Sequence, residues 1–287
     1  MEGVVRKLIK KKKNPLIMGI LNVTPDSFSD GGNFLEKDKA VERGIHMYDE
    51  GADIIDIGGE STRPGSMRVN EEEEIKRVLP VIEKLRNRVD IPLSVDTYKS
   101  NVAEKAIGKG VEIVNDVTAL RRDPRMAEVV RDNRVDVCLM HIQGEPENMQ
   151  KNPEYKDVIQ EIKTFLKKRI DYAEENSISK DRIIIDPGIG FGKRTGQGIE
   201  DNCEIIKSLG EFKKLKTPLL IGASRKTFIG NVCGRNKTLA VNDRLEGSLT
   251  AAILSVLKGA DVVRVHDVKE TRRCLDLLRC VEKSKPC

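Results

Sequence analysis

Short apolar runs recur along the whole chain, separated by polar or glycine-rich segments. Several of these runs are nearly continuous in Leu, Ile and Val, which is typical of parallel strands buried on both faces. Each run therefore predicts one strand of a parallel sheet. The eight predicted strands cover residues 16–21, 53–58, 91–96, 112–117, 135–140, 182–186, 218–223 and 261–266.

Amphipathic stretches lie between most of these runs. Residues 156–173 carry apolar side chains every three to four positions, and residues 268–281 repeat that spacing near the end of the chain. This period is that of a helix with one buried face. Eight alternations of strand and helix predict a closed (β/α)8 barrel of the TIM type, and an open doubly wound sheet is the alternative.

The length of 287 residues suits a barrel that folds as a single domain. We expect this domain to cover residues 14–282, because no low-complexity linker divides the chain. Residues 1–13 precede it as a basic lead-in, whose lysine cluster "KLIKKKKN" we expect to be solvated.

Composition narrows the class of protein. The chain is 38% hydrophobic and 34% charged with a net charge of +5, which favours anionic ligands only weakly. No aromatic residues interleave the lysine cluster, so we expect no nucleic-acid partner. No run approaches the ~18 apolar residues of a membrane span, and no secretory signal is visible, so we expect no membrane partner and a cytoplasmic location. Six scattered cysteines without a C-x-x-C pair are typical of reduced thiols.

Polar side chains follow within a residue or two of where the apolar runs end. In a (β/α)8 barrel the carboxyl ends of all strands meet at one rim, which carries the active site. Any one such residue could simply cap the next helix, but so many together predict a polar pocket. The residues are Asn22, Asp56, Asp96, Asn115, Asp116, His141, Asp186, Ser224, Arg225, Lys226, Arg264 and His266.

The most glycine-rich of these strand ends reads "RIIIDPGIGFGKRT" from residue 182. A phosphate-binding loop of the G-x-x-x-x-G-K-[ST] kind would need glycine at Pro187 and a hydroxyl side chain at Arg194. A dinucleotide fingerprint would need its third glycine at Lys193. Neither motif is present, so nucleotide binding by these motifs does not explain Asp186. Its role has to be inferred together with the other residues of the rim.

The rim suggests two kinds of ligand group. Two carboxylates and an amide, Asp96, Asp186 and Asn115, can together accept several N–H donors, as the edge of an aminopyrimidine would offer. Basic side chains form a second, cationic set that suits phosphate oxygens. Barrels often bind phosphate with the loops after strands seven and eight. This set consists of Arg63, Lys226, Arg264 and His266.

Two loops after predicted strands, residues 22–32 and 58–66, are rich in Gly, Ser, Pro and Asp. This composition is typical of loops that close over a site, and plain connections between strand and helix are the alternative.

The motifs together resemble one family. "MGILNVTPDSFSDGG", "GADIIDIGGESTRPGS", "PLSVDT", "NDVTAL", "LMHIQG", "IIIDPGIGFGK", "GASRK" and "RLEGSLTAAI" follow one another as in the dihydropteroate synthases, from residue 14 to residue 278. The resemblance implies a transferase of folate biosynthesis that joins 4-aminobenzoate to (7,8-dihydropterin-6-yl)methyl diphosphate. The products would be 7,8-dihydropteroate and diphosphate. The diphosphate would carry Mg²⁺ and would leave before the amine attacks. It also implies a homodimer.

The resemblance assigns roles to individual residues. Asp30, Arg63 and Lys226 would be catalytic, and Asn22 would lie near the metal. The substrate-binding set would be Thr62, Asp96, Asn115, Met140, Asp186, Phe191, Gly222, Lys226, Arg264 and His266. The 4-aminobenzoate pocket would be formed by Phe28, Pro64 and Thr227, beside Lys226.

The chain departs from the family pattern in two places. Thr227 stands where the family usually has serine, and residues 193–202 form a longer connection than usual.

Three other functions remain open at this point. A corrinoid methyltransferase that uses methyltetrahydrofolate also holds a pterin in a barrel but needs no diphosphate site, so "STRPGS", "SRK" and "RVH" favour the synthase. A non-catalytic pterin-binding barrel would keep the same scaffold. Lys226 could instead form a Schiff base, as in aldolase-type barrels.

Overall fold

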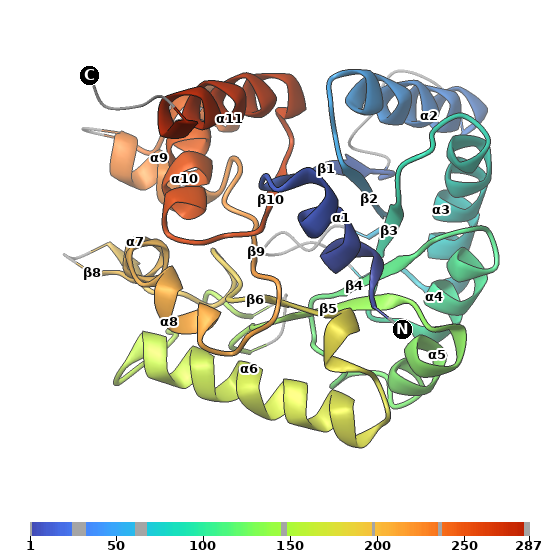
Figure 1. Ribbon diagram of the computed structural model, residues 1–287, viewed down its shortest axis with the longest axis horizontal. Coiled ribbons are helices and arrows are strands. Elements are labelled where there is room, and N and C mark those ends of the chain that lie inside the picture. Colours follow the sequence, from blue (N-terminus) through green and yellow to red (C-terminus); the bar gives the residue numbers. More distant parts are fainter. Residues whose placement is uncertain are drawn as a thin grey trace.

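The protein folds as a parallel eight-stranded barrel surrounded by helices (Figure 1). The computed structural model describes residues 2–24, 33–60, 68–144, 148–196, 199–234 and 237–283. The barrel strands follow one another in the order β6-β5-β4-β3-β2-β1-β10-β9, and a parallel bridge between Ile185 and Leu219 joins the two outer strands. The strands are β1 (Leu16–Asn22), β2 (Ile54–Gly58), β3 (Leu93–Asp96), β4 (Ile113–Asp116), β5 (Asp136–Met140), β6 (Ile183–Asp186), β9 (Leu220–Ile221) and β10 (Val262–Val265).

All eight predicted strands are therefore confirmed, and they form a nearly closed barrel rather than an open doubly wound sheet. The two helices predicted from spacing are also present. Around the barrel lie α2 (Asn33–Asp49), α3 (Glu71–Arg86), α4 (Ser100–Ile107), α5 (Met126–Asn133), α6 (Val158–Glu175), α7 (Asp201–Lys207), α8 (Leu209–Lys213), α9 (Thr227–Cys233), α10 (Leu245–Leu257) and α11 (Val268–Lys283), with short 3-10 turns at Lys180–Arg182 and Val241–Asp243.

Local sequence explains where these helices begin. Asn70 accepts a hydrogen bond from the backbone N–H of Glu73 at the start of α3, and four glutamates fill the first turn, where the helix dipole favours negative charge. Asp157 caps α6 in the same way by accepting from the backbone of Ile159 and Gln160.

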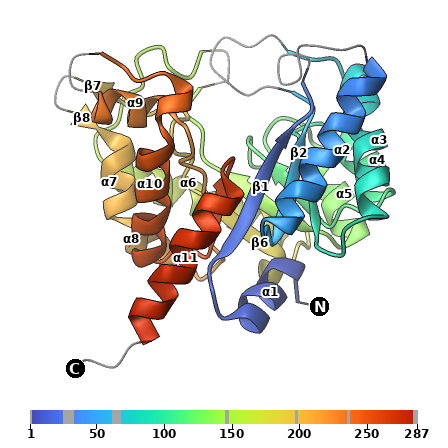
Figure 2. The same ribbon diagram turned by 90° about the horizontal axis from the view of Figure 1, so that it is seen from above.

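Residues 1–13 differ from the solvated lead-in that their charge predicted. Val4–Lys12 form helix α1, which lies at the end of the barrel opposite the carboxyl ends of the strands (Figure 2). Val5 is buried against Leu16, Met18 and Ile54. The apolar face of α1 therefore closes the lower end of the barrel, and its lysines lie on the other side.

The connection over residues 193–202 has structure of its own. β7 (Thr195–Gly196) and β8 (Ile199–Glu200) form a short antiparallel pair. Arg194 and Asp201 hold its base together through hydrogen bonds from the backbone and the guanidinium, with Arg194 Nη2 lying 2.9 Å from Asp201 Oδ1. The extra residues thus form a small hairpin beside α7.

Candidate active site

Alternation along the strands divides the barrel into an interior and an exterior set of side chains. Leu16, Met18 and Ile54 point into the barrel, whereas Ile17 and Ile55 pack against the helices. Continuing each strand by steps of two reaches a second, upper layer of interior positions that is mostly polar. These upper positions are Asn22, Asp56, Gly58, Ser94, Asp96, Asn115, Met140, Asp186, Gly222, Arg264 and His266.

Arg264 lies at the centre of this layer. Its Nε donates to Oδ2 of Asp56 at 2.6 Å, and its Nη2 donates to Oδ2 of Asp96 at 2.7 Å. Asn115 adds a hydrogen bond from Nδ2 to the same Asp56 oxygen at 2.9 Å. These four residues come from four different strands and were predicted to lie at one rim. They form a single hydrogen-bonded network.

The network leaves several acceptor oxygens without a described donor. Among the described residues, no donor contacts the second carboxylate oxygen of Asp96 or the side-chain oxygen of Asn115. Asp186 accepts from the backbone N–H of Gly188 at 2.7 Å through one oxygen, and no described donor meets the other. The upper layer thus offers three acceptors and suits a ligand whose edge carries N–H groups.

Burial makes these carboxylates unusually easy to protonate. Desolvation raises the pKa of Asp96 to about 7 although Arg264 opposes the shift, and the charge of Asp56 adds to it. Desolvation likewise raises the pKa of Asp186 to about 6, against the Gly188 hydrogen bond and the charge of Lys226. Ligand N–H groups would therefore replace hydration that both carboxylates have lost.

Asp186 opens a loop whose backbone geometry requires glycine. Gly188 has a φ of 72°, and a Cβ there would overlap the carbonyl oxygen of His141. Lys193 closes the loop from inside the protein, where its Nζ donates to the Phe191 carbonyl at 2.8 Å and lies 3.1 Å from Nδ1 of His141. Burial lowers the pKa of Lys193 to about 7. The glycines thus serve close packing and not a phosphate.

The predicted apolar walls are present beside these acceptors. Met140 and Phe191 belong to one buried cluster with Tyr98 and Met149. The Nζ of Lys226 lies 3.9 Å from the centre of the Phe191 ring, which is the geometry of a cation–π contact. Gly222 lies against Arg264, because a Cβ there would be in ordinary van der Waals contact with the Arg264 side chain, 3.7 Å from its Cβ.

His266 does not supply a positive charge in this structure. Burial lowers its pKa to about 3, and the charges of Arg264 and Arg225 lower it further. The Ser224 hydroxyl lies 3.0 Å from Nδ1 of His266 and accepts from the His266 backbone N–H at 3.2 Å. If the hydroxyl donates to Nδ1, the ring proton is on Nε2. In that tautomer the neutral ring offers a hydrogen-bond donor.

Some rim residues have structural roles instead. Arg225 pairs with Asp267 and has a φ of 57°, and its backbone carbonyl accepts from Arg244. Asp116 accepts from the backbone of Thr118 and Leu120, and His141 packs edge-on against Phe165. These residues fix the turns that carry Lys226 and Asn115.

Asn22 ends β1 opposite Gly58 of β2. A Cβ at Gly58 would lie 3.9 Å from the side-chain oxygen of Asn22 and 3.8 Å from Oδ2 of Asp96, so the two oxygens flank this glycine. Within the described ranges, no group of three His, Cys, Asp or Glu side chains could hold a metal. A hard cation that carries its own ligands, such as one bound to a phosphate, fits a single amide oxygen of this kind.

Five predicted site residues fall outside the described part of the chain. They are Phe28, Asp30, Thr62, Arg63 and Pro64. Their roles remain predictions. Thr227 is described, and it lies exposed at the first residue of α9 next to Lys226.

Comparison with known proteins agrees with this layout. The sequence model of the family described as "Pterin binding enzyme" matches residues 18–266. The dihydropteroate synthase of Clostridium beijerinckii is 46% identical over 258 residues, which span 90% of this chain and 90% of that protein. That of Escherichia coli is 42% identical over 269 residues, or 94% of this chain and 91% of the other. The chain belongs to the dihydropteroate synthase family of pterin-binding enzymes.

Solved structures of dihydropteroate synthases share the whole fold. The Xanthomonas albilineans enzyme with 4-aminobenzoic acid has a TM-score of 0.88 at 44% identity and covers 95% of this chain and 94% of its own. The same enzyme in complex with 7,8-dihydropteroate has a TM-score of 0.84 at 42% identity, with 95% of each chain covered. These relatives favour the synthase over the corrinoid methyltransferase that the sequence left open.

Two features of this synthase-type site were missed by sequence reasoning. Asp56 was noted only as a strand-end residue, yet its carboxylate joins Asn115 to Arg264. Its position two residues before Gly58, on the interior side of β2, was a readable signal. Lys193 gave no signal beyond its exclusion from a phosphate loop.

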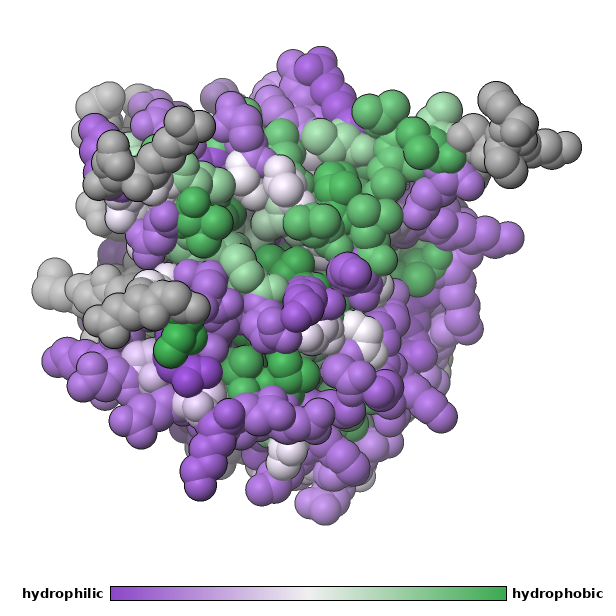
Figure 3. Space-filling view, turned by 90° about the vertical axis from the view of Figure 1, so that its left-hand side faces the viewer, coloured by the Kyte–Doolittle hydropathy of each residue, from purple (hydrophilic) through white to green (hydrophobic). Residues whose placement is uncertain are grey.

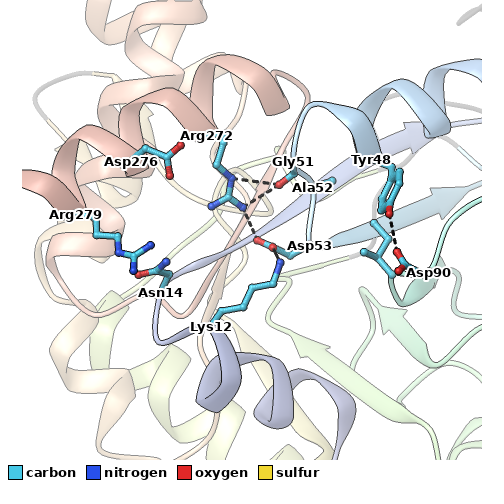
Figure 4. A pocket seen from close by; sticks show the side chains of 11 residues that line it. Lys12, Asn14, Tyr48, Gly51, Ala52, Asp53, Asp90, Arg272, Asp276 and Arg279 are labelled. Atoms are coloured by element: carbon cyan, nitrogen blue, oxygen red, sulfur yellow. Dashed lines mark hydrogen bonds and ion pairs between the residues drawn. The ribbon is translucent and has the colours of Figure 1, made fainter.

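A groove at the opposite end of the barrel lies where α1 and α11 meet the start of β2. Lys12 of α1 and Arg272 of α11 both contact the carboxylate of Asp53 at the start of β2, with Arg272 Nη2 lying 2.7 Å from Asp53 Oδ2 (Figure 4). Asp53 also accepts from the backbone N–H of Ile17 at 2.7 Å. These charges satisfy one another, so the groove holds α1 and α11 to the barrel.

Proposed function

We propose that the upper end of this barrel joins 4-aminobenzoate to (7,8-dihydropterin-6-yl)methyl diphosphate, forming 7,8-dihydropteroate and diphosphate. One observation carries the proposal. Asp96, Asn115 and Asp186 bring three acceptor oxygens without a described donor to the end of the barrel where Met140 and Phe191 also lie, and a pterin presents amino and ring N–H groups along one edge. One proposed substrate and the proposed product are bound in solved relatives, which hold 4-aminobenzoic acid and 7,8-dihydropteroate.

The pterin would lie flat between the apolar wall and Arg264. Met140 and Phe191 would pack on one side, and Gly222, which has no side chain, would let the ring approach on the other. Lys226, held over the Phe191 ring, would donate to the oxygen and nitrogen of the pterin edge remote from the acidic groups. Lys226 would then bind the edge of the pterin that carries hydrogen-bond acceptors. The carboxylates would bind the edge that carries N–H donors.

The leaving group would be held on the β10 side of the rim. Arg264 would supply a positive charge, His266 an N–H donor, and the undescribed Thr62 and Arg63 would complete the contacts. Mg²⁺ bound to the diphosphate and near Asn22 would neutralise part of the departing charge. Arg264 is already neutralised by two carboxylates in the described structure, so diphosphate would have to compete for its guanidinium.

The reaction would be dissociative. The bond between the pterin methylene carbon and the diphosphate oxygen breaks first, and its electron pair leaves with diphosphate. The amine of 4-aminobenzoate then attacks the methylene carbon and loses a proton. Asp30 would face the developing cation, while Phe28, Pro64 and Thr227 would border 4-aminobenzoate. Its carboxylate would meet Thr227 near the start of α9, where backbone N–H groups favour an anion.

A direct assay tests this function. Protein incubated with the pterin diphosphate, 4-aminobenzoate and Mg²⁺ should release dihydropteroate and diphosphate in equal amounts. Binding of the pterin without product would point to a non-catalytic barrel. Excess chelator should abolish turnover because the leaving group loses its counter-charge. Full activity in chelator would contradict the role given to Mg²⁺.

We also propose that the enzyme is a homodimer whose contact lies on α9, α10 and α11. Apolar side chains gather on this face of the molecule (Figure 3). The sequence of α10, "LEGSLTAAILSVL", is apolar on nearly all sides, as expected of a helix covered on every face. The most exposed apolar side chains there are Val232 (58%), Leu254 (44%), Leu257 (53%), Leu277 (66%) and Val281 (62%).

A second copy is the occupant that this face suits, because a two-fold axis brings the same apolar patch together from both chains. Light scattering should give twice the chain mass for the wild type and the single mass for Leu254→Glu combined with Leu277→Glu. Ile199→Glu changes an equally exposed apolar residue on β8 and should leave the mass doubled. A monomeric wild type would contradict the proposal.

Among the described helices, none is long and apolar enough to cross a membrane. The cytoplasmic location remains a prediction from the sequence.

A further inference from the structure

Asp56 lies below the ligand-facing residues of the pocket. It is fully buried on β2, two residues before Gly58, whereas Asp96 is paired with Gly58 itself at the rim. Its Oδ2 accepts from both Asn115 Nδ2 at 2.9 Å and Arg264 Nε at 2.6 Å. Its Oδ1 is buried and has no partner among the described residues. Asp56 is therefore in contact with two proposed substrate-binding side chains.

The contact with Asn115 decides which way that amide points. A carboxylate can only accept hydrogen bonds, so the nitrogen of Asn115 has to face Asp56. The amide oxygen must then lie on the opposite side of the group, where no described donor contacts it. Without Asp56 the amide could turn over and offer its N–H groups to the ligand instead.

Orientation of this amide determines the character of the whole edge. Asp96 and Asp186 are acceptors whichever way they turn when ionised, but Asn115 can be a donor or an acceptor. A donor at Asn115 would oppose a ligand N–H and leave both groups unsatisfied in a buried place, which costs affinity. One side chain thus controls whether the three groups match.

We infer that Asp56 is a positioning residue, which turns the oxygen of Asn115 toward the pocket and so completes an acceptor edge for the N–H groups of a planar heterocycle. The inference rests on the proposed function, and it adds to that function a residue that touches no substrate. Asp56 also pairs with Arg264, so the test must separate amide orientation from charge pairing.

Exchanging the two residues separates these roles. Asp56→Asn alone places two amides together and frees Asn115 to turn over. The pair Asp56→Asn with Asn115→Asp keeps one amide and one carboxylate in contact, and the new carboxylate again presents an oxygen to the pocket. Asn115→Asp alone retains an acceptor in either orientation, although it adds a buried negative charge.

Calorimetric titration with the pterin diphosphate and Mg²⁺ is the measurement, paired with a thermal melt of each sample. Asp56→Asn should weaken binding by about ten- to a hundredfold, the range expected for a lost hydrogen bond to a charged group. The exchanged pair should recover most of this loss, and Asn115→Asp alone should lose less than Asp56→Asn. Recovery by exchange is a result that mere support of the fold by Asp56 would not give.

Asp53→Asn is the matched control, since Asp53 is a buried carboxylate immediately before the same strand and also accepts from an arginine. It should lower the melting temperature and leave the affinity unchanged. Unchanged affinity in Asp56→Asn, or an exchanged pair as weak as Asp56→Asn, would overturn the inference while wild-type binding still supports the proposed function. If Asp56→Asn does not fold, an Asn115→Asp variant that loses a hundredfold or more would overturn the inference. A wild type that neither binds the pterin nor forms dihydropteroate would overturn both.

Discussion

The two ends of the barrel use the same strands and the same alternation, yet the interior of the lower end is mostly apolar and that of the upper end is mostly polar. At the lower end, Leu16, Met18 and Ile54 point inward and helix α1 covers them with Val5. At the upper end, steps of two along the same strands reach Asp56 and Asn115 among other polar groups. Apolar burial at the lower end stabilises the fold, whereas buried charge at the upper end costs stability unless it is paired.

This difference teaches where mutations should act. A change at the lower end should alter stability and leave the chemistry of the folded molecules intact, as is general for barrels of this type. A change at the upper end should alter binding or turnover, with an effect on stability only where a buried charge loses its partner. Variants at the upper end can therefore be compared with variants at the lower end.

The largest effect is expected from Arg264→Leu. It leaves Asp56 and Asp96 buried without their cation, which should lower the free energy of unfolding by about 3–5 kcal/mol. Turnover of the remaining folded protein should fall by more than about a hundredfold, because the proposed diphosphate contact is lost as well. Denaturant melts and steady-state kinetics measure the two effects.

Arg272→Leu is the counterpart at the lower end, where Arg272 pairs with buried Asp53. It should also destabilise the protein but retain turnover per folded molecule. Equal losses of turnover in both variants would show that the two ends are not functionally distinct.

Asp96→Asn should have the next largest effect. The substitution keeps the shape of the side chain but removes its charge and replaces one acceptor oxygen with an N–H donor group. Affinity for the pterin diphosphate should therefore fall by about ten- to a hundredfold. Titration calorimetry measures this loss, and a thermal melt of the same sample checks the fold. Normal affinity with a lowered melting temperature would remove Asp96 from the pterin site.

Val5→Ala tests the lower end alone. Removing buried methyl groups from the contact between α1 and the barrel should lower the free energy of unfolding by about 1–3 kcal/mol. Lys11→Ala on the exposed side of α1 should change it by less than about 0.5 kcal/mol. Urea unfolding monitors both, and dihydropteroate synthesis by the folded Val5→Ala protein should match the wild type. No loss of stability would mean that α1 does not close the barrel in solution.

The sequence predicted the strands well because each one is a mostly apolar run, and it predicted the rim because polar side chains stand at or near the end of each run. Alternation could indicate the inward face of β2, where Asp56 stands two residues before Gly58, but a strand whose two faces are both apolar gives no such signal. The pairing of Arg264 with Asp56 joins residues 208 positions apart and exists only because the barrel closes. The spacing of Val4, Val5 and Leu8 indicates one apolar face of helix α1, although the lysine cluster beside them predicts a solvated segment.

The smallest effect predicted here is the pH dependence of pterin binding. Because ligand N–H groups favour ionised carboxylates, binding should require Asp96 without its proton, and burial raises the pKa of Asp96 to about 7. Affinity should therefore rise with pH by about twentyfold between pH 6 and pH 8, about tenfold from Asp96 and about twofold from Asp186, whose pKa is raised to about 6, and level off above. Titrations with 6-hydroxymethyl-7,8-dihydropterin avoid the ionisation of a diphosphate.

Variants assign this pH dependence to one end of the barrel. In Asp96→Asn only Asp186 remains, with a pKa of about 6, and the rise from pH 6 to pH 8 should shrink to about twofold. Asp136 has a pKa raised to about 6 by burial, but it accepts from the Val5 backbone at the lower end. Asp136→Asn should therefore keep the wild-type profile. An affinity that falls as pH rises would mean that Asp96 binds as the neutral acid and donates a hydrogen bond, which would reverse the polarity assigned to the upper end.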